Sequence, residues 1–343
     1  MAVNIDFGLF DWIDRAPGSL ADQYESRLKL IELADRAGFY GYHLAEHHST
    51  PLGMAPSPSV FFAALAQRTT NIRFGPMAYL LPMYHPVRLI EEVCMLDNLS
   101  NGRMELGISR GVSPYEIACY SIDPEQTRDM FTEVLDIFRA GMCNEVLDYV
   151  GKHFEFHDVP MTIKPVQKPY PPLWYPSFSE AGVEYAAQHG FNFLSLGPPS
   201  LVTHLMEQYR EISAANEERD ERYNAHVAQP KLGAMRQIYI AGTEEAALAT
   251  AKPAYQDWYN SITQLWHRHG DSAYDKFFAW DPSFAGETIL IGSVDKVREQ
   301  IQQLVSASGI NYFVGSFAWG SLSPAQSRQS LELFISEIMP EIN

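Results

Sequence analysis

Hydrophobic positions along the chain recur with two periods, one typical of buried strands and one typical of amphipathic helices. Strands are predicted at Asn4–Phe10, Tyr40–Ala45, Asn71–Leu80, Met104–Ser109, Leu173–Tyr175, Asn192–Leu196, Lys231–Ile240 and Asn311–Ser316. Helices are predicted at Leu20–Arg36, Ser57–Arg68, Pro86–Leu99, Glu125–Ala140 and Glu180–Gln188, from Ser200, from about Thr243, and at Pro324–Ile338. Eight strand and helix pairs in this order predict an α/β fold, a closed parallel (β/α)8 TIM barrel. A doubly wound parallel sheet is the alternative that the same alternation permits.

Two segments exceed the repeating pattern and are predicted to be insertions, at about 144–168 and 253–287. In the first, alternating residues over Tyr149–Phe156 predict a hairpin. The second is rich in aromatic residues, and long loops in a compact domain are often functional lids. An extra helix is predicted at Val294–Ala307. No low-complexity linker divides the chain, so residues 1–343 are predicted to form a single domain.

Composition narrows the classes of protein that fit this pattern. With 46% apolar and 20% charged residues, the chain can bury a large core, and no segment is long and apolar enough for a membrane helix. The N-terminal residues lack the features of a secretory signal, which predicts a cytoplasmic protein. The net charge of -17 disfavours nucleic acid as a partner. Cys94, Cys119 and Cys143 are odd in number and widely spaced, which argues against a disulfide framework or a cysteine metal site.

Polar residues follow several predicted strands at their carboxyl ends, where the active site of such a barrel lies. The second strand ends in Glu46, His47 and His48. We interpret His47 as the acid/base that faces the pocket, the alternative being a residue that only hydrogen-bonds the barrel rim. His43, inside the strand, is interpreted as a core histidine. Because neighbours on an extended strand point opposite ways, His47 and His48 do not predict a metal site.

The fourth strand ends in Ser109 and Arg110, the latter followed by Gly111. The guanidinium of Arg110 suits a phosphate, and the alternative is a structural pair with Glu105 or Asp97. Ser179 and Glu180 mark a predicted helix start, whose amide groups suit the same anion.

Several motifs together resemble bacterial luciferase and the luciferase-like flavin monooxygenases. They are Ala37-Gly38-Phe39, Leu44-Ala45-Glu46-His47-His48, Ile72-Arg73-Phe74-Gly75, Leu81-Pro82-Met83-Tyr84-His85-Pro86, the run from Leu96 to Gly111, Ser179 with Tyr185–Gly190, Ser308–Asn311 and Ile338-Met339-Pro340. The resemblance covers nearly the whole chain and is weakest at 253–287. It implies a barrel that binds reduced FMN (FMNH2), forms a C4a-hydroperoxide with O2 and transfers one oxygen atom to a small organic substrate such as an aldehyde, ketone or aromatic compound.

The resemblance also implies partners and roles. A separate flavin reductase would supply FMNH2, and the protein would be a homodimer. His47 would be the active-site histidine, while Glu46 would support the flavin ring or orient His47. Arg110 and Ser179 would contact the FMN phosphate together with the helix-start amides at Glu180, and Met77 and Ala78 would form a cis peptide beneath the flavin ring.

The chain departs from the flavin-binding luciferase subunit at three positions. Ser109 stands where that subunit has a reactive cysteine beside the flavin, Phe178 replaces an acidic residue and Gly182 replaces a hydroxyl residue. These departures favour a monooxygenase that emits no light. The alternatives are an oxidoreductase of the same fold that uses deazaflavin F420, a noncatalytic flavin-binding relative, and a metal-dependent hydrolase.

Overall fold

A ring of parallel strands forms the centre of the protein. The computed structural model describes residues 5–216, 222–280 and 287–342. The ring contains β1 (Asp6–Asp11), β2 (Gly41–Leu44), β3 (Arg73–Pro76) continued by β4 (Tyr79–Leu80), β5 (Leu106–Ser109), β8 (Leu173–Pro176), β9 (Asn192–Ser195), β10 (Leu232–Ile240) and β12 (Tyr312–Ser316). Each strand pairs in parallel with its neighbours, β12 returns to β1, and β4 pairs with β5. The predicted (β/α)8 TIM barrel is thus confirmed.

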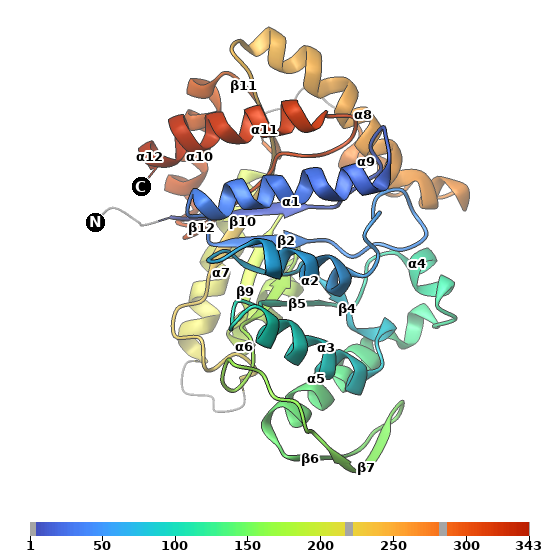
Figure 1. Cartoon of the computed structure of the whole chain (residues 1–343). Helices are drawn as coiled ribbons and strands as arrows, with labels where there is room; N and C mark the ends of the chain where they lie inside the picture. The colour runs from blue at the N-terminus through green and yellow to red at the C-terminus, as the bar shows by residue number, and fades with distance from the viewer. Residues whose placement is uncertain (1–4, 217–221, 281–286, 343) are drawn as a thin grey trace.

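Helices cover the outside of the ring. They are α1 (Leu20–Arg36), α2 (Pro58–Arg68), α3 (Pro86–Leu99), α4 (Pro114–Cys119), α5 (Thr127–Cys143), α6 (Glu180–His189), α7 (Pro199–Ala215), α8 (Glu244–Arg268), α9 (Asp275–Phe278), α10 (Val294–Ser308), α11 (Pro324–Leu333) and α12 (Met339–Ile342), with single turns η1 (Leu81–Met83), η2 (Pro124–Gln126) and η3 (Phe334–Ile338). Figure 1 shows α1, α2 and α3 in sequence along one side of the ring. No helix among the described residues is long and apolar enough to cross a membrane.

Local sequence explains where these helices begin and end. Proline occupies the first turn of α2, α3 and α7, where its missing N–H leaves no hydrogen bond unmade. Ser19 and Ser179 cap α1 and α6 by accepting a backbone N–H with their hydroxyl groups. Gly309 ends α10 with a φ of 60°, a left-handed conformation that glycine adopts without a steric penalty. These capping signals account for the close agreement between predicted and observed helix bounds.

The inside of the barrel is filled by large side chains. His43 is fully buried there, and its Nε2 lies 2.8 Å from the hydroxyl of Tyr312. The Trp174 indole donates to Glu105, which also pairs with Arg73. Burial lowers the pKa of His43 to about 3, so the ring is neutral. This confirms the interpretation of His43 as a core histidine and shows that Glu105 is paired with Arg73 rather than with Arg110.

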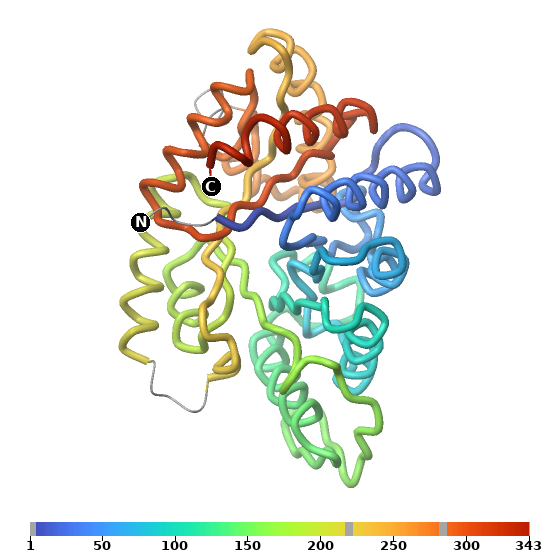
Figure 2. The backbone as a smooth tube through the Cα atoms, turned by 60° about the vertical axis from the view of Figure 1, so that its left-hand side comes forward, coloured from blue at the N-terminus to red at the C-terminus, as the bar shows by residue number. Residues whose placement is uncertain are grey.

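The two insertions differ from each other in structure. The predicted hairpin is present as β6 (Val146–Val150) and β7 (Glu155–Pro160), which pair antiparallel and project from the barrel at the opposite end of the molecule from α8 (Figure 2). The prediction of a long loop from residue 253 is wrong for its first part, because α8 continues through Pro253 to Arg268. The helix buries three of its own side chains just after the proline, those of Ala254, Tyr255 and Trp258. The free energy gained by this packing outweighs the hydrogen bond lost at the proline.

Three smaller differences concern the strands and helices at the rim of the barrel. The predicted strand over residues 71–80 is divided into β3 and β4 by the cis peptide between Met77 and Ala78. The sequence analysis missed β11 (Ile289–Gly292), which pairs with β10, and it missed α4. Both elements are short, so they carry too few residues to display a period.

Candidate active site

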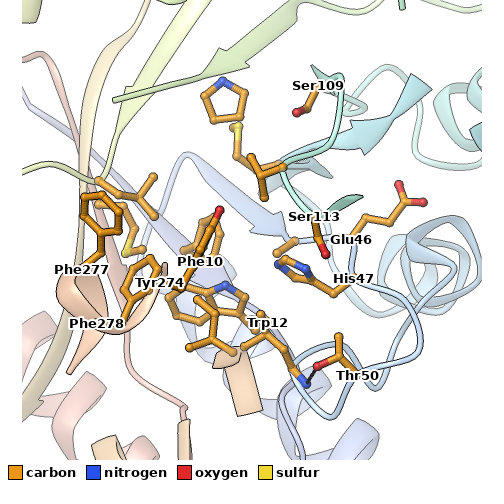
Figure 3. Close-up of a pocket in the computed structure, with 18 of the residues that line it drawn as sticks. Phe10, Trp12, Glu46, His47, Thr50, Ser109, Ser113, Tyr274, Phe277 and Phe278 are labelled. Carbon is orange, nitrogen blue, oxygen red and sulfur yellow. Dashed lines mark hydrogen bonds between the residues drawn. The ribbon is translucent and has the colours of Figure 1, made fainter. Parts of the chain in front are cut away.

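A cavity of about 250 Å³ opens at the carboxyl ends of the barrel strands. Among the predicted site residues, Glu46, His47, Met77, Ala78 and Ser109 line it. Figure 3 shows His47 and Ser113 on one side, with Tyr274, Phe277 and Phe278 facing them from the other. The structure therefore brings residues from the ends of β1, β2, β3, β5, β8, β9 and β10 and from the α9 region to one place, as the barrel topology predicts.

His47 is held by a carboxylate that the sequence analysis did not identify. Its Nδ1 lies 3.2 Å from Oε1 of Glu116, in the short helix α4. Oε2 of Glu116 accepts the backbone N–H of His48 at 2.7 Å. Burial raises the pKa of Glu116, but the charge and hydrogen bond of His47 and the His48 amide outweigh it, so the pKa is lowered overall. An ionised Glu116 accepts a hydrogen bond from the Nδ1–H of His47, which leaves Nε2 of His47 free for the cavity.

Glu46 contacts His48 rather than His47, so that one of its two expected roles, orienting His47, is wrong. Its Oε1 lies 2.7 Å from Nε2 of His48, and Oε2 accepts the N–H of Leu80 and the hydroxyl of Tyr84. Nδ1 of His48 lies 2.7 Å from the hydroxyl of Tyr120. Burial raises the pKa of Glu46 although these contacts oppose it. Figure 3 shows the Glu46 carboxylate directed away from His47, so Glu46 fixes the strand end that carries the catalytic candidate.

The other wall of the cavity is aromatic and comes from β1, α8 and the segment around α9. It contains Phe10, Trp12, Tyr255, Trp258, Trp266, Tyr274, Phe277 and Phe278. Helix α4 holds this wall in place through Tyr115, whose ring stacks on His269 with centroids 4.2 Å apart and planes 3° apart. The hydroxyl of Tyr115 also donates to Asp271 at 3.0 Å. The same short helix therefore carries Glu116, the partner of His47, and Tyr115, which contacts the aromatic wall.

The predicted phosphate contacts lie beside the cavity and do not line it. Arg110 is exposed and makes no hydrogen bond or ion pair with the residues that the structure describes. Its charge lowers the pKa of Tyr175, at the end of β8, although burial raises that pKa overall. The alternative of a structural pair is wrong, since Glu105 pairs with Arg73 and Asp97 accepts from Gln167.

The start of α6 follows directly after β8. Ser179 caps the helix by accepting the N–H of Gly182 at 3.2 Å, and its hydroxyl lies 3.2 Å from that of Ser177. The carboxylate of Glu180 lies 3.2 Å from Nε2 of His204 and is exposed, so only the backbone of Glu180 is available to an anion. Ser177, which also follows the fifth predicted strand, lines the cavity.

Two further features were missed by the sequence analysis. Arg128, in the first turn of α5, also lowers the pKa of Tyr175 electrostatically, and it is exposed. It therefore forms a second cation on the side of Arg110. Glu116 lies in an unpredicted helix, but the N-cap residue Ser113 followed three positions later by an acid is a signal that would have found it. No group of three residues capable of holding a metal occurs in the described part of the chain.

The chain is similar to known proteins over nearly its full length. Residues 5–311 match the family model of luciferase-like monooxygenases. The chain is 36% identical to an uncharacterized protein of Sinorhizobium fredii, over 98% of this chain and 97% of the relative. It is 26% identical to the oxygenase component of the flavin-dependent trigonelline monooxygenase of Acinetobacter baylyi, over 97% of this chain and 94% of that protein.

A solved structure agrees with this similarity. The oxygenating constituent of 3,6-diketocamphane monooxygenase from Pseudomonas putida, a type II Baeyer-Villiger monooxygenase in complex with FMN, superimposes with a TM-score of 0.80 at 25% identity. The match covers 100% of this chain and 99% of that one.

Proposed function

Because the chain belongs to the luciferase-like monooxygenase family, we propose that it is the oxygenase component of a two-component enzyme. It would take FMNH2 from a separate flavin reductase and transfer one atom of O2 to a small organic substrate. The observation that carries this proposal is the pairing of His47 with Glu116 at the mouth of the barrel, opposite an aromatic wall. The similarity to a flavin-dependent oxygenase component and to an FMN complex supports it.

The residues beside the cavity fit a flavin mononucleotide. Arg110 and Arg128 are exposed cations near the end of β8, and the amides at the start of α6 follow that strand. Arginine and helix N-termini both favour a phosphate. Met77 and Ala78 line the cavity, which supports their predicted contact with the flavin ring. We therefore assign the phosphate to the side of Arg110 and the ring to the side of Met77.

The flavin, when bound, would supply the electrons that O2 activation requires. The chain itself controls the proton and the surroundings. Glu116 holds the Nδ1–H of His47, so that Nε2 accepts or returns a proton within the cavity. The aromatic wall excludes water, which strengthens electrostatic interactions in the cavity and suppresses loss of hydrogen peroxide.

An anaerobic absorbance titration with FMNH2 and with reduced F420 tests the choice of cofactor, and we expect saturation with FMNH2 alone. Oxygen uptake and product formation are then measured with a flavin reductase and a panel of aldehydes, ketones and aromatic compounds. We expect His47→Ala to bind FMNH2 normally and to lose most product formation. Oxygenation that survives unchanged in His47→Ala would refute the assigned role, and flavin binding without any product would favour the noncatalytic alternative.

We also propose that the whole chain acts as one domain and forms a homodimer, as the resemblance implies. Light scattering on the purified protein tests the oligomeric state, and a monomer across the micromolar range would contradict it.

A further inference from the structure

Two buried side chains on the cavity wall have hydrogen-bond donors without a partner. Gln237, near the end of β10, is 5% exposed, and its Nε2 makes no hydrogen bond with the described residues. Trp258, in α8, is 2% exposed, and its indole Nε1 is likewise unpaired. Both residues line the cavity, and α8 packs against β10 and β11. The donors therefore lie in neighbouring elements on the substrate side of the site.

Buried donors without partners are rare because each loses its hydrogen bonds to water and gains nothing in return. At a binding site, such donors become favourable when a ligand brings an acceptor. The terminal amide of Gln237 can turn to present either its nitrogen or its oxygen, whereas the indole of Trp258 can only donate. An oxygen acceptor on the ligand is the group that can accept a hydrogen bond from both residues.

The charges around the cavity restrict what carries that oxygen. Glu46 and Glu116 line it, and neither lysine nor arginine occurs among the described lining residues. A carboxylate would meet two acids and neither lysine nor arginine there, so a neutral acceptor is favoured. The remaining wall is largely aromatic, including Trp12, Tyr255 and Phe278. Such a wall buries apolar surface and suits a mostly apolar molecule.

We propose that Gln237 and Trp258 anchor the carbonyl oxygen of a neutral, mostly apolar substrate. This inference rests on the proposed function, since it assigns the substrate side of the same site. Gln237 and Trp258 act as specificity-determining residues. A molecule of the same shape without the oxygen leaves both donors unpaired and binds more weakly.

The test compares acetophenone with ethylbenzene, which has a methylene in place of the carbonyl. Binding is measured by calorimetry with the protein saturated with oxidised FMN, so that the flavin side is occupied and no turnover is needed. For the unchanged protein we expect acetophenone to bind about tenfold more tightly than ethylbenzene, equivalent to about 1.4 kcal/mol. Benzoate, which adds a charge to the acceptor, is expected to bind more weakly than acetophenone.

Two variants locate the anchor. Gln237→Leu keeps the size of the side chain and removes the amide, and it should bring the ratio of the two affinities close to one. Trp258→Phe should reduce the ratio in part. Trp266→Phe is the matched control, because Trp266 lines the same cavity and its indole nitrogen is not among the buried unpaired groups. It should leave the ratio unchanged.

Several results would overturn the inference. Equal weakening of the binding of both probes in Gln237→Leu would show that Gln237 has a packing role alone. Weaker FMN binding with an unchanged ratio of the two probe affinities would assign the amide to the flavin. Failure of both probes to bind would also contradict it. The proposed function is judged separately by oxygen uptake coupled to product. A protein that distinguishes the probes but oxygenates nothing would refute the function, and active oxygenation without discrimination would refute the anchor.

Discussion

His47 and Glu116 are 69 residues apart in the sequence, yet Nδ1 of His47 lies 3.2 Å from Oε1 of Glu116. Their side chains are 18% and 8% exposed, so water weakens the contact little. The pair has the geometry of an imidazole oriented by a buried carboxylate, an arrangement that fixes the tautomer of the ring.

Glu116→Gln should reverse that tautomer. The amide oxygen can still accept the N–H of His48, which leaves the amide NH2 facing Nδ1 of His47, and Nδ1 must then become the acceptor. Nε2 would carry the proton in the neutral ring and could no longer accept one in the cavity. We expect turnover to fall by about 10²-fold, the lower end of the effect of general acid–base catalysis, with FMN affinity unchanged. Steady-state product formation and fluorescence titration measure the two quantities.

Glu211→Gln, on the exposed face of α7, is the matched control and should behave as the unchanged protein. Normal turnover in Glu116→Gln would show that the carboxylate only supports the fold.

The sequence predicted the barrel well because each strand and helix pair carries its own period and caps, as in α1, whose observed bounds match the prediction. His47 was found for the same reason, since a strand end is a local feature. Glu116 and Gln237 were not found, because the roles proposed for them come from which side chains they meet across the barrel. Pro253 misled the helix prediction, since local propensity is outweighed there by the packing of α8.

Arg110→Ala should weaken FMN binding about 10-fold or more while leaving riboflavin binding unchanged. A charge-assisted contact to phosphate contributes about 1.5 to 3 kcal/mol, and riboflavin lacks the phosphate. Arg128→Ala should produce a smaller change of the same kind. Flavin fluorescence quenching measures both ligands. Arg88→Ala serves as the control, because Arg88 pairs with Glu92 on the exposed face of α3. An equal loss of FMN and riboflavin affinity would contradict a phosphate role for Arg110.

Asp14 should make the protein less stable as the pH rises. It is fully buried, its Oδ2 accepts the N–H of Gly320 at 2.7 Å, and burial raises its pKa to about 7 although the charge of Arg27 opposes this. Between the unfolded value of about 3.9 and about 7, the folded state keeps a proton that the unfolded state has lost. The free energy of unfolding therefore decreases across this range as the pH rises.

Asp14→Asn removes this ionisation and retains an acceptor for Gly320. Relative to the unchanged protein, the variant should gain a few kcal/mol of unfolding free energy between pH 5 and pH 8, because a pKa difference of one corresponds to about 1.4 kcal/mol. Urea unfolding at the two pH values measures this change. Asp257→Asn, on the exposed face of α8, should show no such gain. A constant difference between Asp14→Asn and the unchanged protein across the pH range would rule out the titration of Asp14.

Tyr115 should control how well the aromatic wall excludes water. Its ring stacks on His269, and its hydroxyl donates to Asp271, so α4 is fastened to the end of α8 through one side chain. Tyr115 does not line the cavity, and its loss should leave FMN affinity unchanged. Tyr115→Ala removes both contacts and should increase several-fold the share of consumed O2 released as hydrogen peroxide. Tyr115→Phe keeps the stack and should show an intermediate effect.

The ratio of hydrogen peroxide to product per O2 consumed provides the measurement, and hydrogen exchange of α9 reports the opening independently of activity. Because Glu116 follows Tyr115 in the chain, a displaced α4 would also disturb His47. Turnover would then fall together with the share of consumed O2 that yields product. Faster hydrogen exchange in α9 with an unchanged ratio of hydrogen peroxide to product would show that the wall can open without admitting water. If hydrogen exchange and the ratio of hydrogen peroxide to product are both unchanged in Tyr115→Ala, packing of Trp258 and Tyr255 holds the wall without the contacts of Tyr115.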